Sequence, residues 1–543
     1  MQFLKKICFL ISLSLIATML KAASPPVFTR LPSSVAGTEG LRLRINAPEQ
    51  PRYENGAPVV MYLPGGFQGD GLKERETGLT DQGFVEIRFN LPGNGENQDL
   101  SGGGPYDYRG VGSLIALRDI IQFANGSITD KDGNTLSDLI GPATPRSDNV
   151  GLIGWSMGGS TNICVAGRWG HTFQLAWIVN WESPVGDGMP QAECGAKLES
   201  GLRPNTMEVN PAYDPVIGSW NLSTLAFDPQ IQIPILENTQ EHVTGGLFFD
   251  MNQDGQVDMS IDYIPYPLVF EMQDGLKAYY SERLRDKASQ QNLFPAVPPS
   301  HIPSTTEIRQ FWAVRNGARW IDSTIIKLPD LMFIIVANDT DHVQRSPDHP
   351  HVILQYEGFV NAGCRFVRLN PDRSYVESLL GHADPRAVDN PAFMSLDRTD
   401  MKSVVEPVDA NNRDDIGYTL IAAAAACELA DRTQFNNISD QTDGLLTDVK
   451  PAVIPDPESI LLKIYPNPFN ARTTLRFELT EPDEIIINIV NSKGQTIERL
   501  AQALLPKGSH TLFWEASLYP SGLYFCQIIR ENKIQSIKLI YIR

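Results

Sequence analysis

The chain has 543 residues, with 45 Lys and Arg against 64 Asp and Glu, and a formal net charge of −19 at pH 7. This acidity argues against nucleic acid as a partner, because phosphate backbones are bound by clustered positive charge. The length allows roughly two to four domains, and a hydrophobic content of 42% supports buried cores.

Residues 1–22 have the pattern of a secretory signal peptide. Lys5 and Lys6 precede an apolar run, residues 7–20, that is too short to span a bilayer. The small residues Ala22 and Ala23 predict cleavage after Ala22. Export through the periplasm follows from this leader.

Five cysteines remain after cleavage: Cys164, Cys194, Cys364, Cys427 and Cys526. An odd, sparse set in an exported protein permits one or two disulfides and at least one free thiol. No CxxC or Cys/His spacing predicts a zinc site.

Apolar runs alternate between strand and helix lengths along the first 430 residues. Strands are predicted at 41–45, 59–63, 84–89, 149–154, 175–181, 331–336 and 364–369, and helices at 111–124, 161–166 and 414–430. Such alternation predicts a parallel sheet covered on both faces. Residues from 185 to about 325 break the pattern and are rich in Pro, Gly and aromatic side chains, so they are predicted to form an insert.

The strand at 149–154 leads into Gly154-Trp155-Ser156-Met157-Gly158, a G-x-S-x-G pentapeptide. A serine on a sharp turn from strand to helix is held in a strained conformation with its hydroxyl exposed. The flanking glycines leave room for the strand and the helix to approach closely. Ser156 is therefore the predicted nucleophile.

A serine hydroxyl needs a base, for which we predict His382, in the loop after the last sheet strand. His342, His349 and His351 are alternatives that share one polar loop and are expected at its surface.

Asp341, just after the preceding strand, is the predicted acid that orients the base. Its alternatives are Asp339 and Glu182, which follows the 175–181 strand. The order Ser156, Asp341, His382 is the order expected for this kind of turn, and each residue follows the carboxyl end of a strand.

The oxyanion of an acyl-transfer intermediate needs two preorganised N–H donors. Met157, directly after the nucleophile, is predicted to supply one of them. The other is expected from Pro64-Gly65-Gly66-Phe67, from Gly66 first and Phe67 as the alternative.

These residues together resemble the α/β-hydrolase family over roughly residues 40–430. The resemblance implies an eight-stranded, mostly parallel sheet, hydrolysis through a covalent acyl-enzyme without a catalytic cofactor, and a lid in the place of the insert. The family often has His-Gly at the oxyanion turn, where this chain has Pro64-Gly65.

Carboxylic esters are the expected substrates. Peptidase relatives usually carry a large N-terminal propeller, and only about 35 mature residues precede the 59–63 strand. A serine peptidase and a non-catalytic surface binding protein on a hydrolase scaffold are the alternative interpretations.

A second motif, residues 250–258, places oxygen-bearing side chains at positions 1, 3, 5 and 9 with glycine at position 6. This spacing resembles an EF-hand calcium loop. The ligands would be Asp250, Asn252, Asp254, Asp258 and the backbone carbonyl of Gln256. Ile261 replaces the Glu expected at position 12, and Asp262 follows one residue later. A structural calcium ion is the prediction, and an acidic turn is the alternative.

Residues 433–459 are polar without an apolar period, and are predicted to link a catalytic domain, residues 23–432, to a small β-sandwich, residues 460–543. Strands are predicted there at 474–479 and 485–490. The motifs Ile464-Tyr465-Pro466-Asn467-Pro468-Phe469-Asn470, Gly508-Ser509-His510, Trp514 and Ser521-Gly522-Leu523-Tyr524 resemble the C-terminal sorting domain of type IX secretion substrates.

That resemblance implies an outer-membrane secretion machinery as partner, and a protein that is secreted or attached at the cell surface. The alternative for this domain is an Ig-like accessory module.

Overall fold

A computed structural model describes most of the two predicted domains. The described residues are 25–369 without 68, 74–76, 98, 188–192, 194, 200–202, 206–209, 215–218, 236–237, 266, 273, 338–349 and 365; then 420, 423–424 and 426–427; and 462–541 without 466, 468, 480–482, 492–495, 506, 518 and 531–532. The predicted signal peptide and linker lie outside them. The chain divides into two compact units, Met1–Thr447 and Asp448–Arg543.

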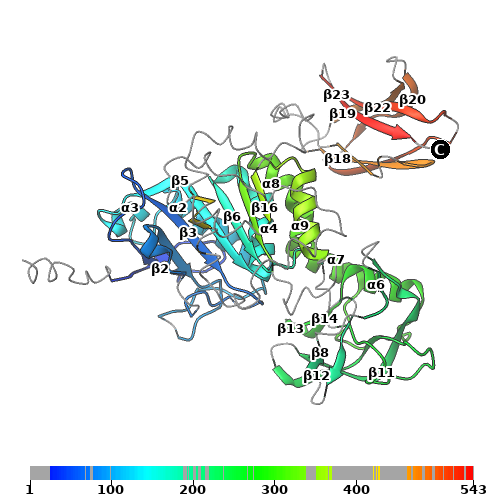
Figure 1. Cartoon of the computed structure of the whole chain (residues 1–543), viewed down its shortest axis with the longest axis horizontal. Coiled ribbons are helices and arrows are strands. Elements are labelled where there is room, and N and C mark those ends of the chain that lie inside the picture. Colours follow the sequence, from blue (N-terminus) through cyan, green and yellow to red (C-terminus); the bar gives the residue numbers. More distant parts are fainter. Residues whose placement is uncertain are drawn as a thin grey trace, which may run out of the picture. The chain divides into compact units, whose positions relative to one another are not determined.

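The first unit is built on an eight-stranded sheet in the order β1-β2-β4-β3-β5-β6-β15-β16. Figure 1 shows its strands from blue (β2, β3) through cyan (β5) to green (β16). The strands are β1 (Val27–Leu31), β2 (Leu41–Asn46), β3 (Ala57–Leu63), β4 (Val85–Phe89), β5 (Pro145–Trp155), β6 (Trp177–Trp181), β15 (Met332–Val336) and β16 (Phe366–Leu369). β2 pairs antiparallel with β1 and β4, and every other pairing is parallel. The predicted eight-stranded, mostly parallel sheet is confirmed.

The central strands are apolar throughout because both faces of the sheet are covered. All seven residues of β3 and all five of β6 are buried. One core joins the sheet to α2 (Val111–Ala124), α4 (Met157–Trp169), α8 (Ile321–Lys327) and α9 (Pro350–Asn361). A second core joins alternate strand residues such as Val60 and Ile153 to the described residues of the predicted last helix, with Leu420 at its margin and Ala423, Ala424, Ala426 and Cys427 buried in it.

Residues between β6 and α8 form the insert. Its described residues contain four antiparallel strand pairs, β7–β8 (Lys197–Glu199, Arg203–Asn205), β9–β10 (Tyr213–Asp214, Ser219–Trp220), β11–β12 (Leu225–Ile235, Asn238–Phe249) and β13–β14 (Leu268–Met272, Gly275–Tyr279). The helices α6 (Glu282–Gln290) and α7 (Thr305–Arg315) follow, and a short 3-10 helix, η4 (Gly317–Trp320), leads into α8. The described part of this unit also has the short helix α3 (Leu136–Ile140) and the 3-10 helices η1 (Leu79–Gln82), η2 (Gly170–Thr172) and η3 (Leu222–Thr224).

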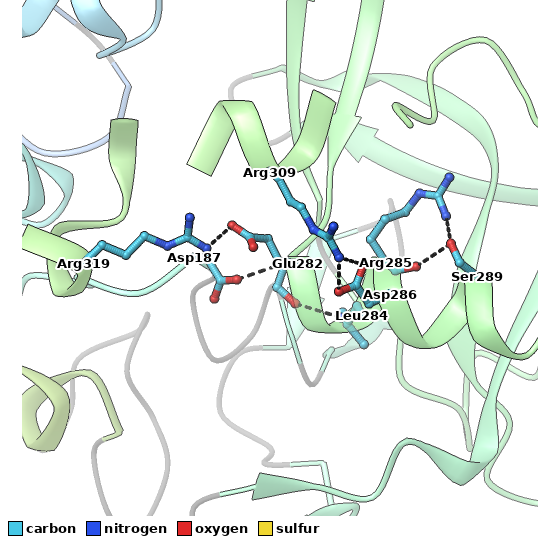
Figure 2. Close-up of polar contacts among 9 residues, drawn as sticks. Asp187, Glu282, Leu284, Arg285, Asp286, Ser289, Arg309 and Arg319 are labelled. Atoms are coloured by element: carbon cyan, nitrogen blue, oxygen red, sulfur yellow. Dashed lines mark hydrogen bonds and ion pairs between the residues drawn. The ribbon is translucent and has the colours of Figure 1, made fainter. Parts of the chain in front are cut away.

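Polar contacts hold α6 to its surroundings (Figure 2). The N–H of Glu282 donates to the Asp187 carboxylate at 3.1 Å, and the Glu282 carboxylate pairs with Arg319 of η4. On the next turn, Asp286 accepts two hydrogen bonds from Arg309 of α7, at 3.1 Å and 2.9 Å. The helix is thus tied both to the segment after β6 and to the neighbouring helix of the insert.

Four of the cysteines, Cys164, Cys364, Cys427 and Cys526, are described, and all four are buried. Burial raises the pKa of the Cys164 and Cys364 thiols to about 12. None of the disulfides that the cysteine count permits forms among these four.

The second unit is a two-sheet antiparallel β-sandwich, with a three-stranded sheet β17-β18-β21 and a four-stranded sheet β20-β19-β22-β23. The strands are β17 (Leu462–Tyr465), β18 (Arg472–Leu479), β19 (Asp483–Asn491), β20 (Thr496–Leu505), β21 (Gly508–Glu515), β22 (Gly522–Arg530) and β23 (Lys533–Tyr541). Both strands predicted here are confirmed. Trp514 is fully buried in the core, where its ring lies 5.2 Å from that of Tyr524.

Candidate active site

Ser156 lies on a strained turn between β5 and α4. Its backbone has φ 50° and ψ −125°, a conformation that non-glycine residues rarely adopt. A β-carbon on Gly154 would lie 2.5 Å from the Cα of Gly159, and one on Gly158 would lie 2.5 Å from the carbonyl oxygen of Leu63. Only glycine therefore fits at both positions of the pentapeptide, as the sequence predicted.

The turn Pro64–Phe67 follows β3 and lies against the serine. A β-carbon on Gly65 would be 3.1 Å from the Cβ of Ser156. Gly66 is exposed and has φ 59°, so the turn is open to a ligand on that side. Met157 opens α4, where the first backbone N–H groups of a helix have no partner within the helix. Both predicted oxyanion residues are thus near Ser156, the predicted nucleophile.

The side chains of Tyr106 and Arg109 contact the backbone of this turn, which the sequence did not indicate. Arg109 donates at 2.6 Å to the carbonyl oxygen of Pro64 and at 2.8 Å to that of Gly66. The Tyr106 hydroxyl donates to the carbonyl oxygen of Phe67. Neither residue belongs to a recognisable motif, and both come from the loop before α2.

An aromatic cluster surrounds the oxyanion residues. Phe67 and Met157 share a buried core with Phe270 of β13, Tyr279 of β14 and Phe311 of α7. The ring of Phe67 lies 4.7 Å from that of Phe270 in an edge-on contact. The insert, predicted to be a lid, therefore supplies apolar side chains to the immediate surroundings of the site.

Two of the three predicted triad residues, Asp341 and His382, lie outside the described residues, as do Asp339, His342 and His349. β15 ends at Val336 and β16 at Leu369, and both run parallel to the neighbouring β6 and β5, so the carboxyl ends of these strands lie at the same edge of the sheet as Ser156. In the sequence, Asp341 and His382 come after these two strand ends.

Glu182, the alternative acid after β6, is described. It is 3% exposed, has φ 46°, and its N–H donates to the carbonyl oxygen of Val336 at 2.8 Å. A buried carboxylate with strained backbone at this edge keeps Glu182 as an alternative to Asp341.

His351 is not on the surface of a polar loop, and that prediction was wrong. It belongs to α9, is 6% exposed, and its Nδ1 accepts a hydrogen bond from the N–H of Gly186 at 3.2 Å. Because α9 packs on the sheet, its first turn is buried, and polar flanking residues could not reveal this.

Residues 250–258 form a tight loop closed by their own side chains. The Asp250 carboxylate accepts from the N–H groups of Asp254 at 3.2 Å and Gly255 at 2.9 Å. Gly255 has φ 78°, which suits the glycine of the predicted turn. At the other end, Asp258 accepts from the N–H of Ser260 at 2.9 Å.

The buried Asp262 bridges this loop, accepting from the N–H groups of Met251 and Asp258 at 2.9 Å and 2.8 Å. Throughout the described residues, no group of three or more His, Cys, Asp or Glu side chains is arranged to hold a metal ion. Calcium binding by the predicted set therefore stays a prediction.

Comparison with known proteins assigns the C-terminal unit. Residues 463–543 match the family described as "Secretion system C-terminal sorting domain". This domain marks proteins that the type IX system exports to the cell surface or beyond, so the localisation predicted from the sequence is confirmed. None of the helices in the described part of the chain has the length and apolar character to cross a membrane.

Solved structures similar to the chain include α/β-hydrolases. The α/β hydrolase GrgF from Penicillium sp. sh18 is 13% identical with a TM-score of 0.30, covering 62% of this chain and 86% of that one. Carboxyl esterase 2 from Tuber melanosporum is 11% identical with a TM-score of 0.32, covering 76% and 88%. The acylaminoacyl peptidase of Pyrococcus horikoshii is 12% identical with a TM-score of 0.33, covering 66% of this chain and 38% of that one. No curated protein matches the chain in sequence.

The first unit thus has a serine-hydrolase type of α/β fold, which its own sheet order and the strained Ser156 turn define. The second is a type IX sorting domain.

Proposed function

We propose that the protein is an exported serine hydrolase that cleaves carboxylic esters through an acyl-enzyme. The observation that carries this proposal is the strained Ser156 at the end of β5 with the Pro64–Phe67 turn against it. A hydroxyl on such a turn is exposed to substrate, and backbone strain outside glycine clusters at functional sites.

In the proposed reaction, Ser156 Oγ attacks the ester carbonyl while His382 takes its proton. Asp341 orients His382 and stabilises the imidazolium that forms. The N–H groups of Gly66 and Met157 hold the oxyanion. His382 then gives the proton to the leaving alcohol, which leaves the acyl group on Ser156. In the second half of the reaction, His382 takes a proton from water, the water attacks the acyl-enzyme, and His382 returns the proton to Ser156 as the acid leaves. No cofactor is required for these steps.

The apolar surroundings of the turn support an ester substrate with an uncharged acyl group. Phe67, Met157 and Phe270 are 6%, 4% and 6% exposed, respectively, so the walls beside the oxyanion residues are aromatic and aliphatic. An uncharged acyl chain loses little hydration there, whereas a charged peptide segment would lose more.

A serine peptidase is the second enzymatic candidate, and a non-catalytic binding protein is the third. The test uses purified full-length protein with acyl esters of graded length and with peptide amides. A fluorophosphonate probe is expected to label Ser156, and Ser156→Ala is expected to abolish both labelling and ester hydrolysis. Amide cleavage faster than ester cleavage would favour the peptidase. Ester hydrolysis that survives in Ser156→Ala would reject the proposal.

We also propose that residues 250–258 hold a structural calcium ion. Support comes from the oxygen chemistry of Asp250, Asn252, Asp254 and Asp258, and from the left-handed Gly255. The Gln256 carbonyl would complete the set. Asp258 would have to turn from Ser260 toward the ion.

A further inference from the structure

Four successive carbonyl groups of the oxyanion turn are held by side chains from the loop before α2. The Arg109 guanidinium donates to three of them, at 2.6 Å to Pro64, 3.3 Å to Gly65 and 2.8 Å to Gly66. The Tyr106 hydroxyl donates to the fourth. The carbonyl side of this turn is thus fully engaged.

This arrangement decides where the N–H groups of the turn point. In a trans peptide, the carbonyl and the N–H of one plane point in opposite directions. Holding the carbonyls of Gly65 and Gly66 at Arg109 therefore turns the N–H groups of Gly66 and Phe67 away from it. These are the two candidate donors for the oxyanion, and the exposed Gly66 is accessible to substrate.

The same guanidinium also connects to the other oxyanion donor. Arg109 Nη1 donates to the Thr161 hydroxyl at 3.4 Å, and that hydroxyl donates to the Met157 carbonyl at 2.9 Å. One side chain thus links the turn after β3 to the first turn of α4.

Arg109 is itself fixed in place. It is 1% exposed, and both Tyr108 and Arg109 have left-handed backbones, with φ 50° and 61°. The Asp107 carboxylate secures the end of this loop by accepting from the N–H groups of Gly110 and Gly112, at 3.0 Å and 2.6 Å. Strain of this kind persists only where the surroundings impose it.

The insert also contributes to this fixation. Arg315, at the end of α7, donates at 2.7 Å to the Tyr108 carbonyl and at 2.6 Å to the Asp107 carbonyl. Arg315 is 7% exposed, so these contacts are shielded from water.

We propose that Arg109 is a positioning residue that aligns both halves of the oxyanion hole, with Arg315 anchoring its loop to the insert. This inference rests on the proposed hydrolase function. Arg109 touches no reacting atom in this scheme, and it acts through the backbone of the turn and through Thr161. A lysine cannot replace it, because a single ammonium group lacks the planar fork that reaches three carbonyls.

The test compares Arg109→Lys with the parent protein on an oxygen ester and on the matching thionoester. The oxygen ester develops an oxyanion that the N–H donors stabilise, so misplaced donors slow its hydrolysis. The thionoester develops its charge on sulfur, which is a weak hydrogen-bond acceptor, so its hydrolysis depends little on the same donors. We expect kcat on the oxygen ester to fall by about 10- to 100-fold with KM within about twofold. The preference for the oxygen ester over the thionoester is expected to fall by about tenfold. Fluorophosphonate labelling of Ser156 is expected to persist at a lower rate.

Arg285→Lys is the matched control. Arg285 is also a buried arginine, 8% exposed, and donates to a backbone carbonyl, that of Pro303, at 3.0 Å (Figure 2 shows its side chain on α6). Its loss is expected to lower Tm without changing the oxygen-to-thiono preference. If Arg109→Lys does not fold, Thr161→Val carries the test, since it removes only the hydroxyl link and is expected to move the preference in the same direction.

An unchanged preference in folded Arg109→Lys, or in Thr161→Val when the lysine variant does not fold, would overturn the inference. Failure of the proposed function has a different signature: ester hydrolysis in Ser156→Ala, or none in the parent protein. Either result would remove the basis of the proposed ester hydrolysis and, with it, of the proposed role of Arg109.

Discussion

The N–H of Ser156 donates a 2.9 Å hydrogen bond to the carbonyl of Trp181. This bond joins the residue after β5 to the last residue of β6. Glu182 directly follows β6, and its N–H donates to the carbonyl oxygen of Val336 at the end of β15. Three strand ends are therefore tied together beside Ser156. The acid of the triad is expected at this edge, either from Asp341 after β15 or from Glu182 after β6.

Asp341→Asn and Glu182→Gln distinguish these two acids. We expect Asp341→Asn and His382→Ala to lower kcat by roughly 10³-fold or more, because triad residues act as a unit. Glu182→Gln is expected to keep most of kcat and to lower stability. Steady-state kinetics with a soluble ester, together with Tm, give the answer. A severe loss of kcat in Glu182→Gln or in Asp339→Asn, with a mild effect of Asp341→Asn, would reassign the acid.

Gly65→Ala tests the contact between the turn and the nucleophile. The added methyl would lie 3.1 Å from the Cβ of Ser156 and 3.3 Å from the ring of Trp155, so the turn must move away. We expect kcat to fall by about 10- to 100-fold, since small misplacements at a catalytic site are costly. Gly358→Ala is the control, because its methyl would meet only the flexible tip of Ile321, at 2.7 Å. Equal kcat in the two variants would contradict the placement of the turn.

The ionisation of Asp130 should make part of the free energy of unfolding depend on pH. Burial raises its pKa, but hydrogen bonds from the Thr29 hydroxyl at 2.7 Å and from the Asn134 N–H at 2.8 Å outweigh this and lower the pKa below the ordinary value. A lowered pKa in the folded state stabilises the fold above the unfolded pKa, and the contribution is lost as pH falls through the folded value.

Asp130→Asn should therefore cost about 1–3 kcal/mol at pH 7. The difference from the parent protein should shrink as the pH drops below about 4. Denaturant unfolding at several pH values measures this difference in the free energy of unfolding between the parent protein and the variant. A difference that stays constant down to acidic pH would show that Asp130 contributes through shape and not through charge.

Calcium is expected to raise the Tm of protein first treated with a chelator. The ion would bind the folded loop at 250–258 and not the unfolded chain, so stability rises with calcium concentration. Asp254→Ala should remove this rise. Asp228→Ala, at a half-buried aspartate of the same insert, is the matched control. If calcium does not shift the Tm of the parent protein, the loop is better described as an acidic turn held by Asp262.

Removal of the C-terminal unit separates export from catalysis. A chain of residues 23–440 is expected to fold and to hydrolyse a small soluble ester at the parental rate, because the sandwich has its own core. In the native host, the same truncation is expected to leave the protein within the cell envelope. Cell fractionation and ester turnover measure the two outcomes. Normal export of the truncated chain, with loss of stability or of activity on a bulky substrate, would instead favour an accessory module.

Local periodicity made much of the architecture predictable. The helix predicted at 111–124 has those bounds in the structure, and each predicted sheet strand is present within a few residues. Strand and helix patterns depend on which face of a segment is buried, and that information lies in neighbouring residues. The glycines around Ser156 were equally informative, since a tight turn restricts residue type at fixed positions.

Local periodicity could not predict the contacts between segments that are distant in the sequence. That Arg109 holds the turn at 64–67, that His351 is buried against Gly186, and that no disulfide joins the described cysteines all depend on which elements meet in space. Arg109 in sequence is an ordinary charged residue before a helix. Its role exists because the sheet order brings β3 next to β5, and because α7, more than 200 residues later, supplies Arg315 to the same loop. The pairing of segments this far apart is set by packing of the whole core, so only the tertiary structure decides it.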